Sequence, residues 1–275
     1  MPIGSRAGRF GLALVGLALA ICMTPVRGEA PRVISLAPHL TELAYAAGAG
    51  DTLVGAVAWS DYPESAQDLA RIGDAFQLNL ERITMLKPTL ALAWEGGTSP
   101  ASAKRLEATG IQTIWVRIRS LDDIGTALAE IGRRLGRTAS GAQAAARFRA
   151  ALAARPSVPE TQRQPAFYQI SEQPLFTLGK RHILSEVLHR CGAYNVFDDL
   201  AVEAAPVDFE TVIARRPVFI IAGAQSIEHD ALARWRRYLA LLPENVRLVE
   251  VNPDTLIRPT PRIIDGMDQL CQKLR

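Results

Sequence analysis

The chain has 275 residues and a formal net charge of +3 at pH 7. All of this excess belongs to residues 1–28, which hold three arginines and no acidic residue. Without that segment the chain has no net charge, and this excludes the overall basic surface of a protein that binds nucleic acid along its backbone. Local basic patches are compatible with this balance.

Residues 1–28 have the three parts of a secretory signal peptide. Two arginines precede an unbroken apolar stretch at residues 10–23. That stretch is shorter than the about 20 apolar residues that a membrane-spanning helix needs. Val26 and Gly28 then suit a signal-peptidase site, so we expect export and cleavage near Gly28. A retained anchor and lipid attachment at Cys22 are the alternatives.

Two cysteines remain after removal of the signal peptide, Cys191 and Cys271. An even number of cysteines in an exported chain favours one disulfide. The bridge would close a loop of about eighty residues, and loop entropy then gives a stabilisation of ~4 kcal/mol. Two free buried thiols are the alternative.

The first half of the mature chain alternates short apolar segments with amphipathic ones. Strands are expected at residues 33–36, 53–57, 90–94 and 111–116. Helices are expected at 41–48, at 79–86, in a segment ended by Gly110, and at 120–135. Thr41 is the expected cap of the first helix, and Ser120 with Asp123 forms a capping-box variant for the last. This alternation is typical of a largely parallel sheet with helices on both faces, an α/β fold.

The second half repeats the pattern. Strands are expected at residues 165–170, 218–222 and 246–251, and helices at 183–189, 209–215, 227–241 and 261–274. Between the halves, residues 138–155 are rich in Ala and Arg and contain no proline, which predicts one helix of roughly 25 Å. We expect an N-terminal lobe at 31–136, a connecting helix at 137–156 and a C-terminal lobe at 163–275. A surface helix of one larger domain is the alternative.

A segment of the first half is repeated in the second. Residues 79–93 can be laid on residues 208–222 at a constant offset of 129 positions. Both segments start with a residue that can cap a helix, Asn79 or Asp208, and both place a glutamate at the same step, Glu81 or Glu210. The repeat supports two similar lobes, although helix caps and stops recur in unrelated units.

Several short motifs together resemble one known family. They are Pro31-Arg32-Val33-Ile34-Ser35-Leu36-Ala37-Pro38, Thr41-Glu42-Leu43-Ala44, Ser60-Asp61-Tyr62-Pro63, Asn79-Leu80-Glu81-Arg82-Ile83, Leu86-Lys87-Pro88, Phe176-Thr177, Gly179-Lys180, Cys191-Gly192, Pro261-Arg262-Ile263 and Gln269-Leu270-Cys271. In this order they resemble the periplasmic cobalamin-binding proteins of bacterial ABC importers, a family of metal, corrinoid and siderophore binders with a helical backbone. The resemblance implies two Rossmann-like lobes joined by a single long helix, with a corrinoid such as cobalamin held in the cleft between them. It also implies a monomer in the periplasm that meets a permease dimer in the membrane.

The resemblance assigns six residues to the ligand. Four are aromatic walls for a broad, flat corrin: Trp59, Phe76, Trp94 and Phe176. Two more, Asp254 and Arg258, meet its polar fringe. The alternatives are core aromatics and a surface ion pair. Where a relative carries further aromatics, this chain has Ile170 and Ala204.

The resemblance also assigns Glu81 and Glu210, one in each lobe, to docking on the permease dimer. An acidic side chain near a helix start is favoured by the helix dipole as well. The sequence shows no nucleophile elbow and no phosphate-binding loop, so we expect no enzyme, no catalytic cofactor and no nucleic-acid partner. The histidines have no compact metal-ligand spacing, so no metal site is expected.

Two rival functions remain open at this point. A haem- or siderophore-binding importer component would have the same architecture, with Tyr62 or His39 as a ligand to haem iron. An exported α/β enzyme with a different kind of site is the second rival.

Overall fold

The first sheet consists of five parallel strands in the order β3-β2-β1-β4-β5. Their bounds are β1 (Val33–Ser35), β2 (Leu53–Ala56), β3 (Ala70–Arg71), β4 (Leu90–Trp94) and β5 (Gln112–Val116). The helices of this half are α1 (Pro38–Ala46), α2 (Leu80–Leu86), α3 (Pro100–Glu107) and α4 (Leu121–Arg134), with short 3₁₀ turns η1 (Gly50–Thr52) and η2 (Glu64–Asp68). The four predicted strands are confirmed, and β3 adds an edge that the sequence did not predict.

The computed structural model describes residues 1, 4, 30–74, 76–223 and 230–275. The predicted cleavage site near Gly28, and nearly all of the predicted signal peptide, lie outside the described residues. Residues 31–275 form one compact unit that contains both sheets. Within the described ranges, no helix is long and apolar enough to span a bilayer.

The second sheet is mixed, with the order β11-β10-β6-β7-β9 and β8 beside β6. Its strands are β6 (Gln164–Glu172), β7 (Leu175–Leu178), β8 (Ala193–Asn195), β9 (Ala204–Pro206), β10 (Phe219–Gly223) and β11 (Arg247–Val251). Strands β7 and β9 are antiparallel to their neighbours. A largely parallel sheet was expected here, and that expectation was wrong because two residues, Gln173 and Pro174, join β6 to β7 as a hairpin.

The remaining helices of the second half are short except for the last. They are α6 (Ile183–Arg190), α7 (Phe209–Ala214), α8 (Ala233–Arg237), α9 (Pro253–Leu256) and α10 (Ile263–Leu274), with 3₁₀ turns η3 (Glu160–Gln162) and η4 (Leu239–Leu241). The expected helix at 227–241 was wrong in the part that can be judged: residues 227–229 lie outside the described residues, and α8 and η4 cover only part of the rest. The fully buried Trp235 fixes α8, because it packs against Phe167 and stacks on Phe209.

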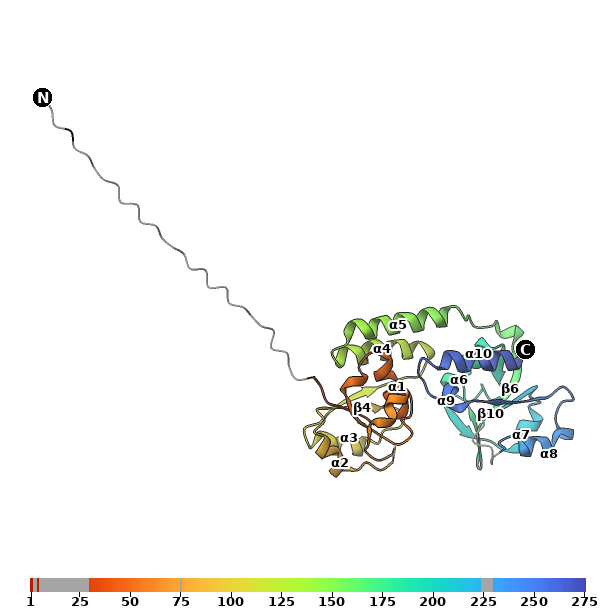
Figure 1. Ribbon diagram of the computed structural model, residues 1–275. Coiled ribbons are helices and arrows are strands. Elements are labelled where there is room, and N and C mark those ends of the chain that lie inside the picture. The colour runs from red at the N-terminus through yellow and green to blue at the C-terminus, as the bar shows by residue number, and fades with distance from the viewer. Residues whose placement is uncertain (2–3, 5–29, 75, 224–229) are drawn as a thin grey trace. The chain divides into compact units, whose positions relative to one another are not determined.

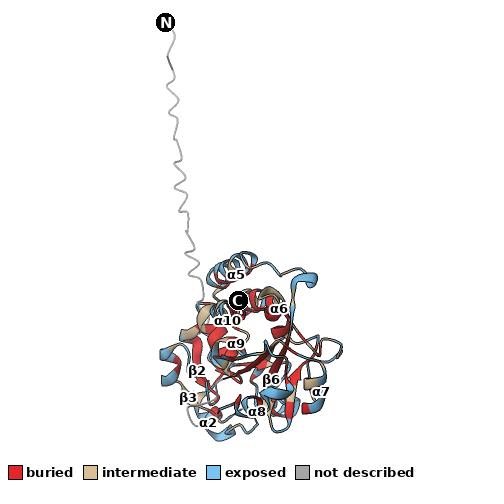
Figure 2. Ribbon diagram, turned by 90° about the vertical axis from the view of Figure 1, so that its right-hand side faces the viewer, coloured by how far each residue is buried: buried red, intermediate tan, exposed pale blue. Residues whose placement is uncertain are grey.

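Helix α5 (Thr138–Ala153) lies between the two sheets in chain order and packs along α4 (Figure 1). Two glycines allow the two helices to approach closely. A Cβ atom on Gly132 would lie 2.6 Å from the Cα atom of Gly141, a distance that side chains do not tolerate. The outward side of α5 is exposed (Figure 2). The predicted fold class, α/β with two lobes, is confirmed.

One hydrophobic cluster takes side chains from both halves. Leu128 of α4 and Phe148 of α5 belong to it together with Leu188 of α6 and Met267 of α10. The halves therefore share apolar packing on the side where α4, α5, α6 and α10 lie. This arrangement leaves the carboxyl ends of the strands free to form a site.

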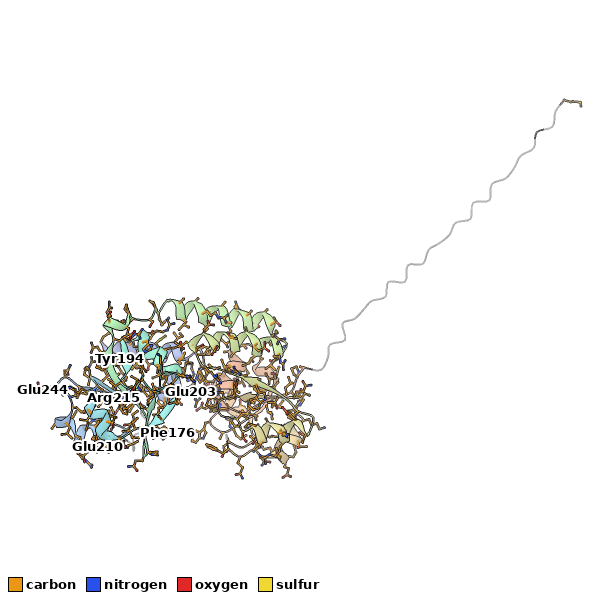
Figure 3. All side chains as sticks on the ribbon, turned by 180° about the vertical axis from the view of Figure 1, so that it is seen from behind. Phe176, Tyr194, Glu203, Glu210, Arg215 and Glu244 are labelled. Atoms are coloured by element: carbon orange, nitrogen blue, oxygen red, sulfur yellow. A yellow bond between two sulfur atoms is a disulfide. The ribbon has the colours of Figure 1, made fainter. Side chains whose placement is uncertain are left out.

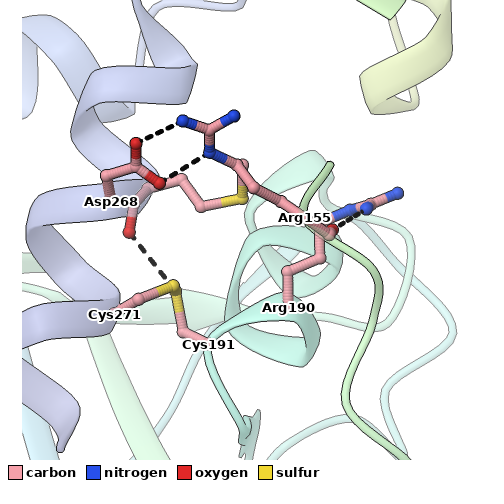
Figure 4. The surroundings of a disulfide bond; sticks show 6 residues. Arg155, Arg190, Cys191, Asp268 and Cys271 are labelled. Carbon is pink, nitrogen blue, oxygen red and sulfur yellow. Dashed lines mark hydrogen bonds and ion pairs between the residues drawn. A yellow bond between two sulfur atoms is a disulfide. The ribbon is translucent and has the colours of Figure 1, made fainter. Parts of the chain in front are cut away.

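The predicted disulfide between Cys191 and Cys271 is confirmed, and it joins the end of α6 to α10 (Figure 4). Next to it, Arg155 follows α5 and donates two hydrogen bonds to the Asp268 carboxylate of α10, at 2.6 and 2.5 Å. Arg190 donates to the carbonyl oxygen of Arg155. These bonds fix the chain at the point where it leaves α5 for the second sheet.

The predicted helix cap at Thr41 was wrong. Helix α1 begins at Pro38 instead of after Thr41, since proline suits the first helical position. The Thr41 hydroxyl lies inside the helix, 3.2 Å from the Ser60 hydroxyl. In the repeated segments, the Asn79 side chain accepts a hydrogen bond from the Arg82 N–H, but the Asp208 side chain makes no such bond.

Candidate functional site

A groove lies where loops from both lobes meet, and three adjoining hollows form it. The first, of about 320 Å³, is lined by residues of the second half that include Ile170, Ala222 and Ile257. The second, of about 250 Å³, takes His39 and Trp94 from the first half and shares Ile257 with the first hollow. A third hollow, of about 520 Å³, shares four residues with the second: Arg119, Arg181, His182 and Glu203. The three hollows therefore adjoin one another.

The position of the groove follows from the topology. In α/β sheets, ligands bind beyond the carboxyl ends of the parallel strands, where the connecting loops gather. Trp94 is the last residue of β4, and Pro38 with His39 opens α1 just after β1. Across the groove, Ala222 and Gly223 end β10 and Pro253 begins α9 after β11.

Trp94 and His39 form one wall of the second hollow. Their rings meet edge to face, with centroids 5.1 Å apart. His39 is only 6% exposed, and its Nε2 atom has no hydrogen-bond partner among the described residues. Burial, and secondly the positive charge of Arg258, lowers the pKa of the His39 imidazole to about 4. The ring is therefore neutral at ordinary pH and keeps an unused polar nitrogen beside the groove.

The other predicted aromatic walls lie outside these three hollows. Trp59 is 78% exposed and Phe76 is 93% exposed, both in loops of the first half. Trp59 also has a φ of 65°, an uncommon backbone conformation for a bulky residue. Phe176 is partly buried and lies in strand β7. Figure 3 shows Phe176 and Glu203 on the side of the second half nearest the first half.

Of the two positions that differ from the resembled family, one lines a hollow and the other does not. Ile170, at the end of β6, lines the first hollow and supplies an aliphatic surface there. Ala204 opens β9 and is exposed, and it is not part of the three hollows.

Arg258 lies at the centre of a charged network that joins the halves. Its guanidinium lies 2.9 Å from the Glu42 carboxylate, 2.6 Å from Asp61 and 3.2 Å from Asp254. Arg262 adds two hydrogen bonds to Glu42, at 2.6 and 3.0 Å. Glu42 is 3% exposed, so its charge is compensated by the two arginines instead of by water. Burial tends to raise the pKa of Asp61, but the hydrogen bond and charge of Arg258 outweigh it and hold that pKa below its usual range.

The predicted ligand residues Asp254 and Arg258 are thus in contact with each other and with this network. Arg258 also lines the second hollow. The sequence reasoning missed Glu42, which lies 216 positions from Arg258 and is brought to it only by the fold.

The predicted docking residues Glu81 and Glu210 are both exposed in the first turn of a short helix, α2 and α7 respectively. Among the described residues, neither carboxylate has an ion-pair partner. Helices α2 and α7 lie on the side of the molecule away from α5 (Figure 1), and Figure 3 shows Glu210 at that edge.

Within the described ranges, no three His, Cys, Asp or Glu side chains gather as a metal site. The sequence reasoning did not identify His182, Ile257 or the basic residues of the third hollow. The local pattern that could have pointed to these basic residues is Gly179-Lys180, where a glycine precedes consecutive basic residues after an apolar segment.

Known proteins are similar to this chain in both sequence and fold. The model of the periplasmic binding protein family matches residues 33–234. A vitamin B12-binding protein of Vibrio cholerae is 36% identical over 249 residues, which are 90% of each chain. The crystal structure of the periplasmic vitamin B12-binding protein of Vibrio cholerae aligns with a TM-score of 0.79 at 36% identity, covering 89% of this chain and 96% of that one.

A periplasmic haem-binding protein of Roseiflexus has a TM-score of 0.77 at 23% identity and covers 90% of this chain and 98% of its own. At that identity the likeness concerns the fold alone. The family match spans most of the chain, and the relative from Vibrio cholerae is similar along nearly its whole length. The chain therefore belongs to the periplasmic binding protein family.

Proposed function

We propose that this protein captures cobalamin or a related corrinoid in the groove and delivers it to an ABC importer of the inner membrane. The observation that carries the proposal is the groove of three adjoining hollows that both lobes line, in a chain 36% identical to a vitamin B12-binding protein over 90% of its length. A corrin is a broad, mostly apolar disc with an amide fringe, and such a ligand fits a groove whose walls combine apolar side chains with polar ones.

The exposed aromatic residues support a flat apolar ligand. Trp59 and Phe76 leave 78% and 93% of their surface open, so both rings are accessible to a ligand. The positive φ of Trp59 has a conformational cost that a functional position can explain. We propose that both contact the corrin from the first lobe, with Trp94 in the groove and Phe176 on the second lobe. Each aromatic wall contributes about 1.5–3 kcal/mol on full burial.

We propose that Asp254 and Arg258 meet the polar amides of the ligand from within the charged network. Asp254 is more exposed than Arg258, with 58% against 15% of the side-chain surface open. Ligand amides therefore reach Asp254 first, while Arg258 holds it in place across one helical turn.

Haem is the second candidate ligand, because His39 presents a neutral ring with an unused nitrogen beside the groove. Of the two ligands expected for haem iron, Tyr62 lines none of the three hollows, and the Arg262 guanidinium lies 3.9 Å from the centre of its ring.

A fluorescence titration tests the proposal. Cyanocobalamin at micromolar concentration should quench tryptophan emission, and Trp94→Leu should weaken binding about tenfold to a hundredfold because one aromatic wall is lost. Trp115→Leu is the matched control, since Trp115 is partly exposed in β5 and lines none of the three hollows. Quenching by haem without quenching by cyanocobalamin would replace the corrinoid with the second candidate. Recovery of chemically unchanged cobalamin separates binding from an exported enzyme.

The cellular context is also part of the proposal. We propose export to the periplasm with cleavage near Gly28, a monomer in solution, and lobes at 31–136 and 163–275 joined by the helix at 137–156. Glu81 and Glu210, one on each lobe, would dock on the two equivalent subunits of a permease dimer. Their exposure and lack of ion-pair partners among the described residues support this role.

A further inference from the structure

The third hollow differs from the rest of the groove in its charge. None of the six residues assigned to the corrin lines it, but Arg119, Lys180, Arg181 and His182 do. Since it shares residues with the second hollow, a ligand in the groove can extend into it.

Lys180 and Arg181 are exposed cations on a firmly held loop. The N–H groups of Lys180 and Arg181 donate to the carbonyl oxygens of Leu200 and Val202, at 2.9 and 3.3 Å. A Cβ atom on Gly179 would lie 2.2 Å from the Val202 carbonyl oxygen, so only glycine permits this close approach. Among the described residues, neither cationic side chain has an ion-pair or hydrogen-bond partner. The loop therefore presents two unpaired positive charges to the hollow.

His182 adds a hydrogen-bond donor at the boundary of the second and third hollows. Its Nδ1 atom accepts a hydrogen bond from the Leu184 N–H at 3.1 Å. Burial lowers the pKa of His182 to about 4, so the ring is neutral. A neutral imidazole that accepts at Nδ1 carries its proton on Nε2, and this N–H is the donor that remains for a ligand.

The acidic residues of the hollow do not cancel its positive charge. The Glu186 carboxylate accepts a hydrogen bond from the Leu121 N–H at 3.2 Å, and burial raises its pKa. Glu203 is exposed at the rim. Arg119 lies 3.7 Å from Glu95 outside the hollow. Glu95 also pairs with Arg117, so it does not cancel the charge of Arg119 alone. The three cations Arg119, Lys180 and Arg181 face the two acids Glu186 and Glu203, and the balance stays positive.

We propose that the third hollow is a subsite for a phosphate diester, in which Lys180, Arg181 and the Nε2–H of His182 bind the anionic nucleotide loop of the corrinoid. The inference rests on the proposed function and makes it more specific. The corrin ring carries neutral amides, whereas the nucleotide loop carries one phosphodiester anion, which matches a site with two unpaired cations and a neutral donor. These residues would distinguish complete corrinoids from those without a nucleotide.

Two ligands that differ in the nucleotide loop test the proposal. The dissociation constants of cyanocobalamin and of dicyanocobinamide, which lacks the nucleotide and its phosphate, are measured for the wild type and for Lys180→Gln/Arg181→Gln. The double variant should bind cyanocobalamin about tenfold more weakly at low salt, with a smaller loss at high salt, because charge-assisted bonds to an exposed anion are screened. Its affinity for dicyanocobinamide should not change, which also shows that the variant is folded.

The matched control removes two cations elsewhere. Arg134→Gln/Arg147→Gln alters exposed residues of α4 and α5 that line none of the three hollows and should leave both affinities unchanged. An equal loss for both ligands in Lys180→Gln/Arg181→Gln, or no loss for either, overturns the phosphate subsite while the corrinoid function stands. A wild-type protein that binds neither ligand overturns the proposed function and the subsite with it.

Discussion

At the scale of single residues, His39 places a buried polar atom, Nε2, beside the groove without a hydrogen-bond partner among the described residues. The ring is buried against Trp94, with Nε2 unpaired in the described structure and with the pKa lowered to about 4. In the unfolded chain a histidine has a pKa of about 6.5. The unfolded state therefore binds more protons than the folded state between these two values, and folding stability must fall as the pH falls through this window.

We expect His39→Gln to reduce this pH dependence. Between pH 6.5 and 4.5 the wild type should lose up to about 1 kcal/mol of unfolding free energy per pH unit through His39, because the uptake of one proton is worth at most about 1.4 kcal/mol per unit. Glutamine is neutral throughout, so the contribution disappears while all other groups titrate as before. Urea unfolding at several pH values measures the two slopes. Identical slopes would mean that His39 is protonated as easily in the folded protein as in the unfolded chain.

At the residue scale, the sequence predicts the position of a side chain that ends or directly follows an apolar strand, while its role toward a ligand stays a prediction. Trp94 ends a strand of five mostly apolar residues, so its place at the groove follows from the strand itself. Glu42 could not be found in this way, because its partners Arg258 and Arg262 lie over two hundred positions away. Its burial in the first half has no local signature. Only the fold reveals it.

At the scale of elements, helices α2 and α7 repeat the same design in both halves. Each follows a polar residue, carries an exposed glutamate in its first turn and leads into a buried strand, β4 or β10. The helix dipole favours an acid at this position in either helix. It does not require that both acids lack an ion-pair partner within the described part of the chain, and docking on two equivalent sites would explain that shared property.

We expect Glu81→Ala/Glu210→Ala to abolish transport and to leave corrinoid affinity unchanged. The two acids lie outside the hollows of the groove, so ligand contacts are preserved, while two docking contacts are lost together. Cobalamin uptake by cells that depend on the importer and titration of the purified protein give the two measurements. Glu107→Ala/Glu244→Ala, which removes one exposed acid from each half, is the control. Weakened binding in the purified docking variant would assign these acids to the ligand.

Strands were predicted more accurately where the apolar segment is longer and is clearly bounded by helix signals on both sides. Strands β4, β10 and β11 are contiguous apolar or alternating segments between helix signals, and their predicted bounds hold to within one residue. Strands β7, β8 and β9 have three or four residues each and exist because β6 pairs with β7 and β8, and β7 in turn pairs with β9. Pairing of that kind depends on distant chain segments, so local patterns do not show it.

At the scale of the whole molecule, two sets of interactions hold the halves together. One is the apolar cluster that α4, α5, α6 and α10 share. The other is the network in which Arg258 and Arg262 from the second half hold Glu42 of the first. The alternation of strands and helices predicted two lobes correctly. It carried no information about these ties, since both depend on how the lobes meet.

We expect Glu42→Gln to destabilise the protein by about 3 kcal/mol. The change leaves the Arg262 guanidinium, which is 18% exposed, without its carboxylate, and uncompensated buried charge is costly. Arg258 keeps Asp61 and Asp254, which limits the loss. Chemical denaturation gives the free energy of unfolding, and Glu64→Gln, an exposed acid in η2, should change it by no more than about 0.5 kcal/mol. A loss as small as that of the control would show that the network does not stabilise the fold.

The shared apolar cluster also limits how ligand can enter and leave. A wide separation of the lobes would expose apolar side chains of four helices to water. The free-energy cost of this exposure grows in proportion to the apolar area exposed. Loading and unloading should therefore proceed by small movements of the loops at the edge of the groove, and not by a wide separation of the two lobes. A membrane partner that releases the ligand therefore has to displace the loops at the edge of the groove.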